Sequence, residues 1–315
     1  MVDKTIPWNR KYRPATIDDL VVTPETKAWV ESIISTKVIP NITLYSSQHG
    51  VGKTTIAKII ANQCCAEDEI LFINGSLDRG IDVIRNEMTD FISCATLRNG
   101  RKCIIIDEAD SMNIITLAAM RAFMEEWDQV VSFILTCNDL TKFADVKTEP
   151  ILSRCPVRDL SINKTRDRLG GPMLNRLSHI LRMEDIEYDV EDLKKLVIAY
   201  YPDIRIMINH LQTGSLTGKF RYDLVKTDSV ADINVPQLTR YLKAKDFQEI
   251  RTWAKMYTTA PSIYDVLYAN FVEIIDPCKY EDLLKILGKY AYESGITASK
   301  EITFTACLME LGTLL

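Results

Sequence analysis

Short, continuous apolar runs alternate with amphipathic stretches over the first 160 residues. The runs are NITLYS (41–46), EILFIN (69–74), KCIIID (102–107) and VVSFILT (130–136). Runs of this length that are rich in Ile, Val, Leu and Phe predict strands buried on both faces of a sheet. The intervening patterns predict helices at about 53–65, 81–96 and 114–127. This alternation of strand and helix predicts an α/β fold with a parallel, doubly wound sheet.

The pattern changes near residue 160, where the strand-like runs stop. Apolar positions at helical spacing predict three helices between 169 and 212, and further helices from 235 to 315. The stretch 213–229 is polar, contains two glycines and is interpreted as a linker. We therefore expect an α/β domain over 1–160, a small helical domain over 161–228 and an all-α domain over 229–315.

Composition excludes some classes of protein but does not identify the partners of this one. The net charge is −5, which leaves nucleic-acid binding open because phosphate contact needs only a local row of Lys and Arg. The eight cysteines form no CxxC pair, so we expect reduced thiols and no zinc site. No apolar run approaches the roughly 20 residues that cross a bilayer, and the first residues lack the apolar core of a secretory signal. We expect a cytoplasmic protein.

The stretch SSQHGVGKTT (46–55) follows a predicted strand and opens a predicted helix, which is the context of a phosphate-binding P-loop. Gly50 and Gly52 allow backbone N–H groups to face phosphate oxygens, Lys53 is expected at the β- and γ-phosphates, and the Thr54 hydroxyl is expected to ligate Mg²⁺. One departure from GxxxxGK[ST] is Ser47 in place of the first glycine, which fits if its φ stays negative. The residues expected to contact ATP here are Ser47, Gln48, His49, Gly50, Val51, Gly52, Lys53, Thr54 and Thr55.

IIIDEAD (104–110) supplies the matching acidic pair at the end of a buried strand. Asp107 is expected to hold Mg²⁺, and Glu108 is expected to deprotonate the attacking water. Asn138, just past the fourth strand and beside the P-loop strand, is expected near the γ-phosphate or the water. The competing interpretations are an acidic cluster without chemistry and an asparagine that only makes a turn. A DEAD-type helicase is set aside because it needs a second α/β domain, whereas the second half here is helical.

Five further segments, in order along the chain, carry a resemblance to a known family. They are WNRKYRP (8–14), LDRGIDVIR (77–85), MRAFMEEW (120–127), EPILSRC (149–155) and PDIRIMINHLQ (202–212). With the P-loop and the acidic pair, the chain resembles the AAA+ sliding-clamp loaders, and most the large ATPase subunit of the loaders of large tailed bacteriophages. The resemblance implies an AAA+ ATPase domain, a helical lid and a helical collar that assembles subunits.

The resemblance also implies roles for particular residues. The segment 8–14 lies against the adenine in the family, so Lys11, Tyr12, Arg13 and Pro14 are expected at the nucleotide. Arg205 occupies the position of the lid arginine that binds the γ-phosphate; without the resemblance it would be interpreted as a helix-surface arginine in a salt bridge. Arg154 is expected to follow the region where the last strand of the sheet begins, at the edge away from the P-loop. We therefore predict that Arg154 acts in catalysis on ATP bound to a neighbouring subunit.

Contacts to DNA and to the clamp are predicted on two other segments. For DNA we expect Arg79 and Arg85 with the backbone amides at the helix start near Ile81, the alternative being an ion pair of Arg85 with Asp82 or Glu87. For the clamp we expect Met112, Ile114 and Ile115, the alternative being a helix start that faces the core.

The predicted function is a DNA-stimulated ATPase subunit that opens a processivity clamp and places it on primer-template DNA. The partners implied are the sliding clamp, a small loader subunit and further copies of this chain, four in a ring of five, in the host cytoplasm if a phage encodes it. One alternative is a related AAA+ replication or branch-migration ATPase, a helicase or helicase loader, which would lack the SRC segment and the helical tail. Another is a structural role with an inactive P-loop, suggested by Ser47 but opposed by the retained Lys53, Thr54, Asp107 and Glu108.

Overall fold

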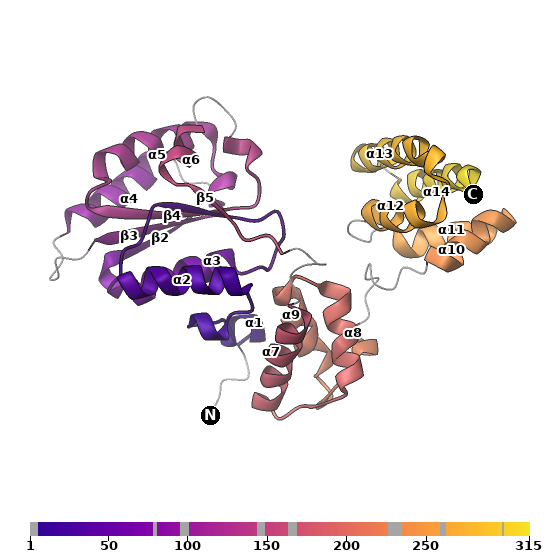
Figure 1. The fold of residues 1–315 in the computed structure, drawn as a ribbon, viewed down its shortest axis with the longest axis horizontal. Helices are drawn as coiled ribbons and strands as arrows, with labels where there is room; N and C mark the ends of the chain where they lie inside the picture. The colour runs from indigo at the N-terminus through magenta and orange to yellow at the C-terminus, as the bar shows by residue number, and fades with distance from the viewer. Residues whose placement is uncertain are drawn as a thin grey trace. The chain divides into compact units, whose positions relative to one another are not determined.

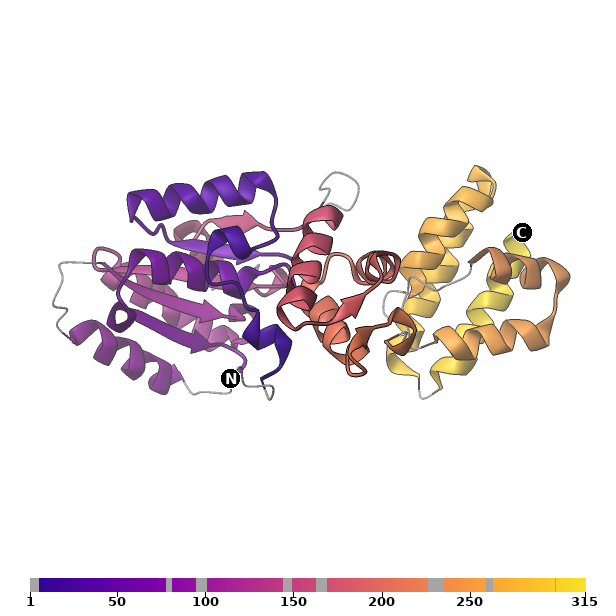
Figure 2. The ribbon, with the colours of Figure 1, turned by 90° about the horizontal axis from the view of Figure 1, so that it is seen from below.

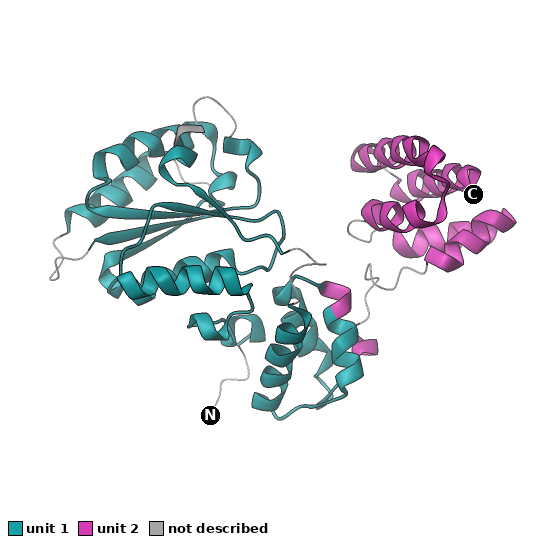
Figure 3. Cartoon of the chain, in the orientation of Figure 1, with its two compact units in different colours: residues 1–197, 201–221 teal, residues 198–200, 222–315 magenta. Residues whose placement is uncertain are grey.

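The computed structural model describes residues 6–77, 81–94, 101–143, 149–162, 169–225, 235–258, 263–297 and 299–315. The chain forms two compact units, one of residues 1–197 and 201–221, the other of residues 198–200 and 222–315 (Figure 3). Each unit is described by itself below. Within the described ranges, no helix is both long and apolar enough to cross a membrane.

The first unit is built on a five-stranded parallel sheet. Its strands are β1 (Ile42–Tyr45), β2 (Ile70–Asn74), β3 (Lys102–Asp107), β4 (Val131–Cys137) and β5 (Val157–Asp159). Their order is β2-β3-β4-β1-β5, and every neighbouring pair is parallel (Figures 1 and 2). The predicted parallel α/β sheet is confirmed, and the carboxyl ends of its strands meet at one edge, where the sequence concentrates polar residues.

Helices cover both faces of this sheet because its central strands are apolar on both sides. On one face lie α2 (Pro24–Thr36) and α3 (Lys53–Cys64); on the other lie α4 (Ile81–Ser93), α5 (Ile114–Trp127) and α6 (Glu149–Arg154) (Figure 1). Along β3, Cys103 and Ile105 join the core cluster under α2 and α3, whereas Ile104 and Ile106 join the cluster under α4 and α5. This alternation follows from the two-residue period of a strand and fixes the register of the sheet.

A helical subdomain, residues 169–221 apart from 198–200, completes the first unit. It consists of α7 (Gly170–Met183), α8 (Val190–Tyr200) and α9 (Ile204–Gly214), with a small parallel pair of strands β6 (Glu187–Tyr188) and β7 (Lys219–Phe220). The short helix α1 (Trp8–Lys11) packs on α9. The interpretation of 213–229 as a linker is wrong for its first half: Phe220 is fully buried against Gly214, where an added Cβ would lie 2.8 Å from the ring. The predicted domain boundary near residue 160 stays a prediction.

The second unit is helical, as predicted. Its helices are α10 (Val235–Ala244), α11 (Phe247–Tyr257), α12 (Ile263–Ile274), α13 (Tyr280–Ile296) and α14 (Lys300–Leu311). The continuous pattern over 235–257 divides into two helices because Lys245 adopts a left-handed φ of 54° and Asp246 then caps α11 by accepting from the amide of Glu249 at 3.2 Å. Trp253, Phe271 and Phe304 lie in the core of this unit.

Candidate functional site

The P-loop joins β1 to α3 at the carboxyl edge of the sheet. Gly50 and Gly52 have φ values of 69° and 95°, which glycine adopts without steric cost. Outside glycine, the described residues with positive φ are Lys37, Glu108, Asp185 and Lys245, so Ser47 turns with a negative φ, as predicted. The loop therefore accepts a serine at its first position.

Lys53 is held at the base of this loop by the backbone. Its Nζ donates to the carbonyls of Ser46 and Gln48, both at 2.9 Å. Burial lowers the pKa of Lys53, while the nearby Cys137 and Asp110 act to raise it. An ammonium group in this position is set up to bind a polyphosphate, because an anion would offset the cost of burying the charge.

Asp107, at the end of β3, receives two hydroxyl groups on one carboxylate oxygen. Thr54 Oγ1 donates to Asp107 Oδ1 at 2.6 Å and Thr136 Oγ1 donates to the same atom at 2.7 Å. A carboxylate beside hydroxyl oxygens is the oxygen-rich set that Mg²⁺ prefers, so these residues fit the ion. Thr136 was missed by the sequence analysis, although a polar residue at the end of an otherwise apolar strand was a usable signal.

Glu108 follows in a constrained turn. Its φ and ψ are 54° and 48°, a left-handed conformation that costs a non-glycine residue about 1–2 kcal/mol. Two contacts hold it there: its N–H donates to Thr136 Oγ1 at 3.0 Å, and its carbonyl lies against Gly75, where an added Cβ would approach to 2.6 Å. The turn directs the exposed Glu108 side chain toward the space above Asp107 and the P-loop.

Asn138 lies across from Lys53 in a turn fixed by Asp110. Asp110 Oδ2 accepts the backbone N–H groups of Asn138 and Asp139, both at 3.0 Å. Asn138 lines a small cavity of about 50 Å³ together with His49, Lys53 and Arg205. The structure thus brings together the P-loop lysine, the amide after β4 and the arginine of the helical subdomain at one cavity, and their contact with a γ-phosphate stays a prediction.

A larger cavity of about 560 Å³ extends from the P-loop to the helical subdomain. The predicted residues that line it are Tyr12, Arg13, Pro14, Gly50, Val51, Gly52, Thr54, Thr55, Asp107, Glu108 and Arg205. Residues that the sequence analysis missed include Lys58, Phe72, Arg176, Ile204 and Ile208. Lys58 lies over the Phe72 ring at 4.0 Å, and burial lowers its pKa, with a smaller effect from Arg13. The cavity volume suits a nucleotide.

Helix α9 meets the P-loop through Asp203. The Asp203 carboxylate caps α9 by accepting the amides of Arg205 at 2.9 Å and Ile206 at 3.0 Å. The same carboxylate occupies the space next to Gly50, where a Cβ would lie 1.8 Å from Oδ1. This contact sets Arg205 at the mouth of both cavities.

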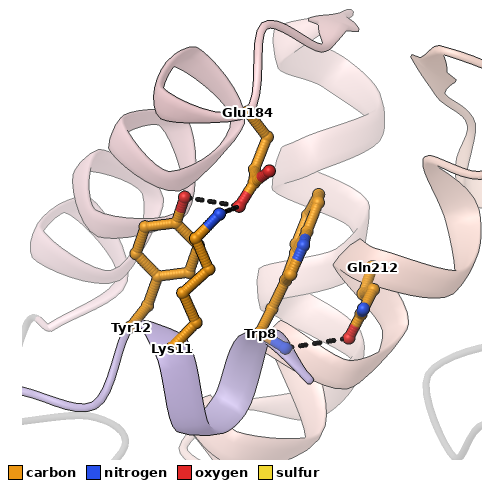
Figure 4. A network of polar contacts seen from close by, with 5 residues as sticks. All are labelled: Trp8, Lys11, Tyr12, Glu184 and Gln212. Carbon is orange, nitrogen blue, oxygen red and sulfur yellow. Dashed lines mark hydrogen bonds and ion pairs between the residues drawn. The ribbon is translucent and has the colours of Figure 1, made fainter. Parts of the chain in front are cut away.

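Three residues predicted to contact the nucleotide are not among those that line either cavity: Lys11, Ser47 and Gln48. The Lys11 ammonium instead forms an ion pair with Glu184 at the end of α7 (Figure 4). The Gln48 amide makes two hydrogen bonds with the backbone of Ile162, at 2.9 and 2.7 Å. The expected contacts of these two side chains are therefore corrected: each bonds protein groups that flank the site.

Arg154 ends α6 and forms an ion pair with Glu125 on α5. The expectation that it follows the start of the last strand, at the edge away from the P-loop, is wrong, because Arg154 precedes β5, which begins at Val157 and pairs directly with β1. However, β5 runs parallel to β1, so its amino end lies at the opposite end of the sheet from the P-loop. Arg154 lines neither cavity.

The residues predicted to contact DNA and the clamp have mixed outcomes. Arg79 lies outside the described residues, whereas α4 begins at Ile81 and Arg85 on it is exposed. Met112 is 5% exposed and packs in the core cluster with Leu117 and Met120 of α5, so the prediction that it meets a partner is wrong and the core-facing alternative holds. Ile114 and Ile115 are 45% and 74% exposed and stay available to a partner.

Comparisons with known proteins agree with this site. Residues 43–159 match the family described as "ATPase family associated with various cellular activities (AAA)". The chain is 30% identical over 310 residues to the sliding-clamp-loader large subunit of Enterobacteria phage T4, covering 96% of this chain and 94% of that protein. It is 34% identical over 233 residues to replication factor C subunit 4 of Saccharomyces cerevisiae, covering 72% and 68%. The Thermotoga maritima RuvB branch-migration motor has a TM-score of 0.53 at 16% identity over 87% of this chain and 90% of RuvB, a likeness of fold alone.

Proposed function

Because this chain belongs to the family of sliding-clamp-loader ATPase subunits, we propose that it hydrolyses ATP to place a sliding clamp on primer-template DNA. It is an ATPase and works in a hetero-oligomeric complex with the clamp and other loader subunits. The observation that supports the chemistry is the hydrogen bond from Thr54 Oγ1 to Asp107 Oδ1, at 2.6 Å. Lys53 and Glu108 are the next residues along the chain from this pair, and Thr54, Asp107 and Glu108 line the cavity of about 560 Å³.

Each group has a separate task in hydrolysis. Lys53 and Arg205 offset the charge of the β- and γ-phosphates, and Asn138 orients the γ-phosphate or the attacking water. Glu108 accepts a proton from that water. Thr54 and Asp107 would hold Mg²⁺, which would supply charge neutralisation on the phosphate oxygens.

The assembly is proposed from the likeness to the clamp-loader subunits. Four copies join one smaller subunit, with residues 161–228 acting as the lid and 229–315 as the collar. Arg154 serves the ATP of a neighbouring copy. Arg79, Arg85 and the start of α4 contact the DNA backbone, while Ile114 and Ile115 contact the clamp.

A steady-state ATPase assay of the complex, with and without primed DNA and clamp, tests this function. We expect hydrolysis to rise when both are present and to be abolished by EDTA. Glu108→Gln should lower the stimulated rate by about 10²–10⁴-fold, because glutamine has nearly the shape of glutamate but cannot accept the proton of the attacking water. Lys194→Gln, an exposed change on α8, is the matched control. Hydrolysis that ignores primed DNA and clamp would contradict the clamp-loading function.

A further inference from the structure

The N-terminal segment, residues 8–14, is fastened to the helical subdomain through one carboxylate (Figure 4). Tyr12 Oη donates to Glu184 Oε1 at 2.6 Å, and the Lys11 ammonium forms an ion pair with the same oxygen. The Lys11 and Glu184 side chains are only 19% and 16% exposed, so water screens this pair weakly. Glu184 itself is fixed at the end of α7, where its own N–H bonds the Ile180 carbonyl at 3.1 Å.

Two further contacts hold the same segment to the same subdomain. The N–H of Trp8, in the first turn of α1 where helix amides lack intrahelical partners, donates to Gln212 Oε1 on α9 at 2.9 Å (Figure 4). Arg176 on α7 donates to the carbonyl of Tyr12 at 3.1 Å and pairs with Asp19 at 3.3 Å. The segment is therefore attached to α9 at Trp8 and to α7 at Tyr12.

The fastened segment is also a wall of the large cavity. Tyr12, Arg13 and Pro14 line it, as do Ile204 and Ile208 from α9. If ATP binds as proposed, the P-loop holds its phosphates. The part of the cavity that is lined by Tyr12, Pro14, Ile204 and Ile208 is then left for the ribose and the base.

We propose that Glu184 is a positioning residue for the base of the bound nucleotide. It links the N-terminal segment to the helical subdomain. This link fixes the distance between the two walls of the cavity around the base, one formed by the segment and the other by α9. The inference rests on the proposed nucleotide site and adds to it a residue that touches neither the phosphates nor the metal ligands. On this proposal, recognition of the nucleotide base depends on Glu184, whereas recognition of the phosphates is independent of Glu184.

The test compares a ligand that has a base with one that lacks it. The affinities of the full-length chain for ATP and for inorganic tripolyphosphate are measured by competition against a fluorescent ATP analogue, corrected for the affinity of the analogue itself. We expect Glu184→Ala to weaken ATP binding about tenfold, since it removes two hydrogen bonds that involve a charged group. Tripolyphosphate binding should change less than about twofold, because its contacts lie at the P-loop.

Graded variants keep the test independent of folding defects. Glu184→Gln retains an acceptor for the Tyr12 hydroxyl but loses the ion pair, so its ATP affinity should fall between those of wild type and Glu184→Ala. Lys11→Met should resemble Glu184→Gln and add little to it in a double variant, because both remove the same pair. Glu191→Gln is the control: it makes the same charge change in the same subdomain, in an exposed pair with Lys194 on α8 that takes no part in this network.

Each outcome of these measurements either supports or overturns the proposal. A loss of ATP affinity in the Glu184 variants with tripolyphosphate unchanged supports the proposal. Equal losses for both ligands, or no loss for either while the wild type binds ATP, overturn it and leave the proposed function standing. A wild-type chain that binds neither ligand overturns the proposed function as well.

Discussion

At the scale of single residues, Gly50 is the most constrained position of the P-loop. Its φ of 69° disfavours any side chain, and the Asp203 carboxylate fills the place that a Cβ would take. The residue therefore does two things: it turns the phosphate-binding loop and lets α9 approach it. A substitution at Gly50 acts on the loop and on the helical subdomain together.

We expect Gly50→Ala to weaken ATP binding at least tenfold and to lower the free energy of unfolding by about 1–2 kcal/mol. The strain arises from the left-handed φ, and the clash displaces Asp203 from the start of α9. Equilibrium binding and thermal unfolding measure the two effects.

A double variant and a second glycine test that explanation. Gly50→Ala with Asp203→Ala removes the clash and keeps the strain, so it should bind ATP better than Gly50→Ala with Asp203→Asn, which keeps the bulk. Gly171→Ala is the control, because nothing lies within 4 Å of its added Cβ in α7 and binding should not change. Equal affinities of the two double variants would contradict a role for the contact with Asp203.

Residue types with fixed spacing explain why part of this site could be predicted. Lys53, Thr54, Asp107 and Glu108 are set by a loop and a strand end, both local in sequence. Asp203 meets Gly50 and Glu184 meets Lys11 across more than 150 residues of sequence, and these contacts depend on how the helical subdomain packs. Met112 was misjudged because a short apolar turn between polar residues has the same sequence whether it faces a partner or the core.

At the scale of elements, Lys102 determines how α4 ends. Its side chain is only 7% exposed, and its Nζ donates to the carbonyls of Phe91, Ile92 and Cys94, the last two at 3.1 and 2.5 Å. These carbonyls belong to the last turn of α4 and the residue after it, where helices lack intrahelical donors. The first residue of β3 thus caps the helix that precedes it.

Lys102→Met should lower the free energy of unfolding by about 1–3 kcal/mol, because it keeps the length of the side chain but leaves partly buried carbonyls without their donor. Denaturant unfolding followed by circular dichroism measures the loss. Lys194→Met, which breaks only an exposed pair on α8, should leave stability unchanged. A Lys102→Met protein as stable as the Lys194→Met control would show that water replaces the ammonium at no cost.

Elements with a long apolar pattern could be predicted from the sequence. Elements whose formation depends on the burial of one side chain could not. The strands β1 to β4 and the helices between them follow from runs and periodic patterns of apolar residues. The pair of β6 and β7 did not, because each has two residues and its stability comes from burial of Phe220. A two-residue strand carries no period that a sequence can show.

At the scale of the whole molecule, the position of Arg154 bears on how copies of the chain cooperate. Arg154 precedes β5, whose amino end lies opposite the P-loop edge, and it lines neither cavity of its own unit. An arginine that serves ATP from there must serve the ATP of another copy. Arg154 pairs with Glu125 between α6 and α5, and its side chain is 32% exposed.

Arg154→Ala should leave the ATP affinity of the isolated chain within about twofold of wild type and lower stimulated hydrolysis in the complex by about 10³–10⁵-fold. Both effects follow from removing a charge that acts only in the transition state of a neighbour. Equilibrium binding and the steady-state assay measure them. An isolated chain that loses most of its ATP affinity would contradict action in trans.

Mixing two inactive variants tests the geometry directly. In a complex assembled from Arg154→Ala and Glu108→Gln chains, some Arg154→Ala subunits keep their own Glu108 and receive Arg154 from a Glu108→Gln neighbour. Hydrolysis should therefore return in the mixture if Arg154 acts between copies. A mixture of Lys53→Ala and Glu108→Gln chains is the control, because both lost groups belong to one site and no subunit regains the pair. Recovery in the first mixture alone requires an active site completed by two chains, whereas recovery in neither assigns Arg154 to its own subunit.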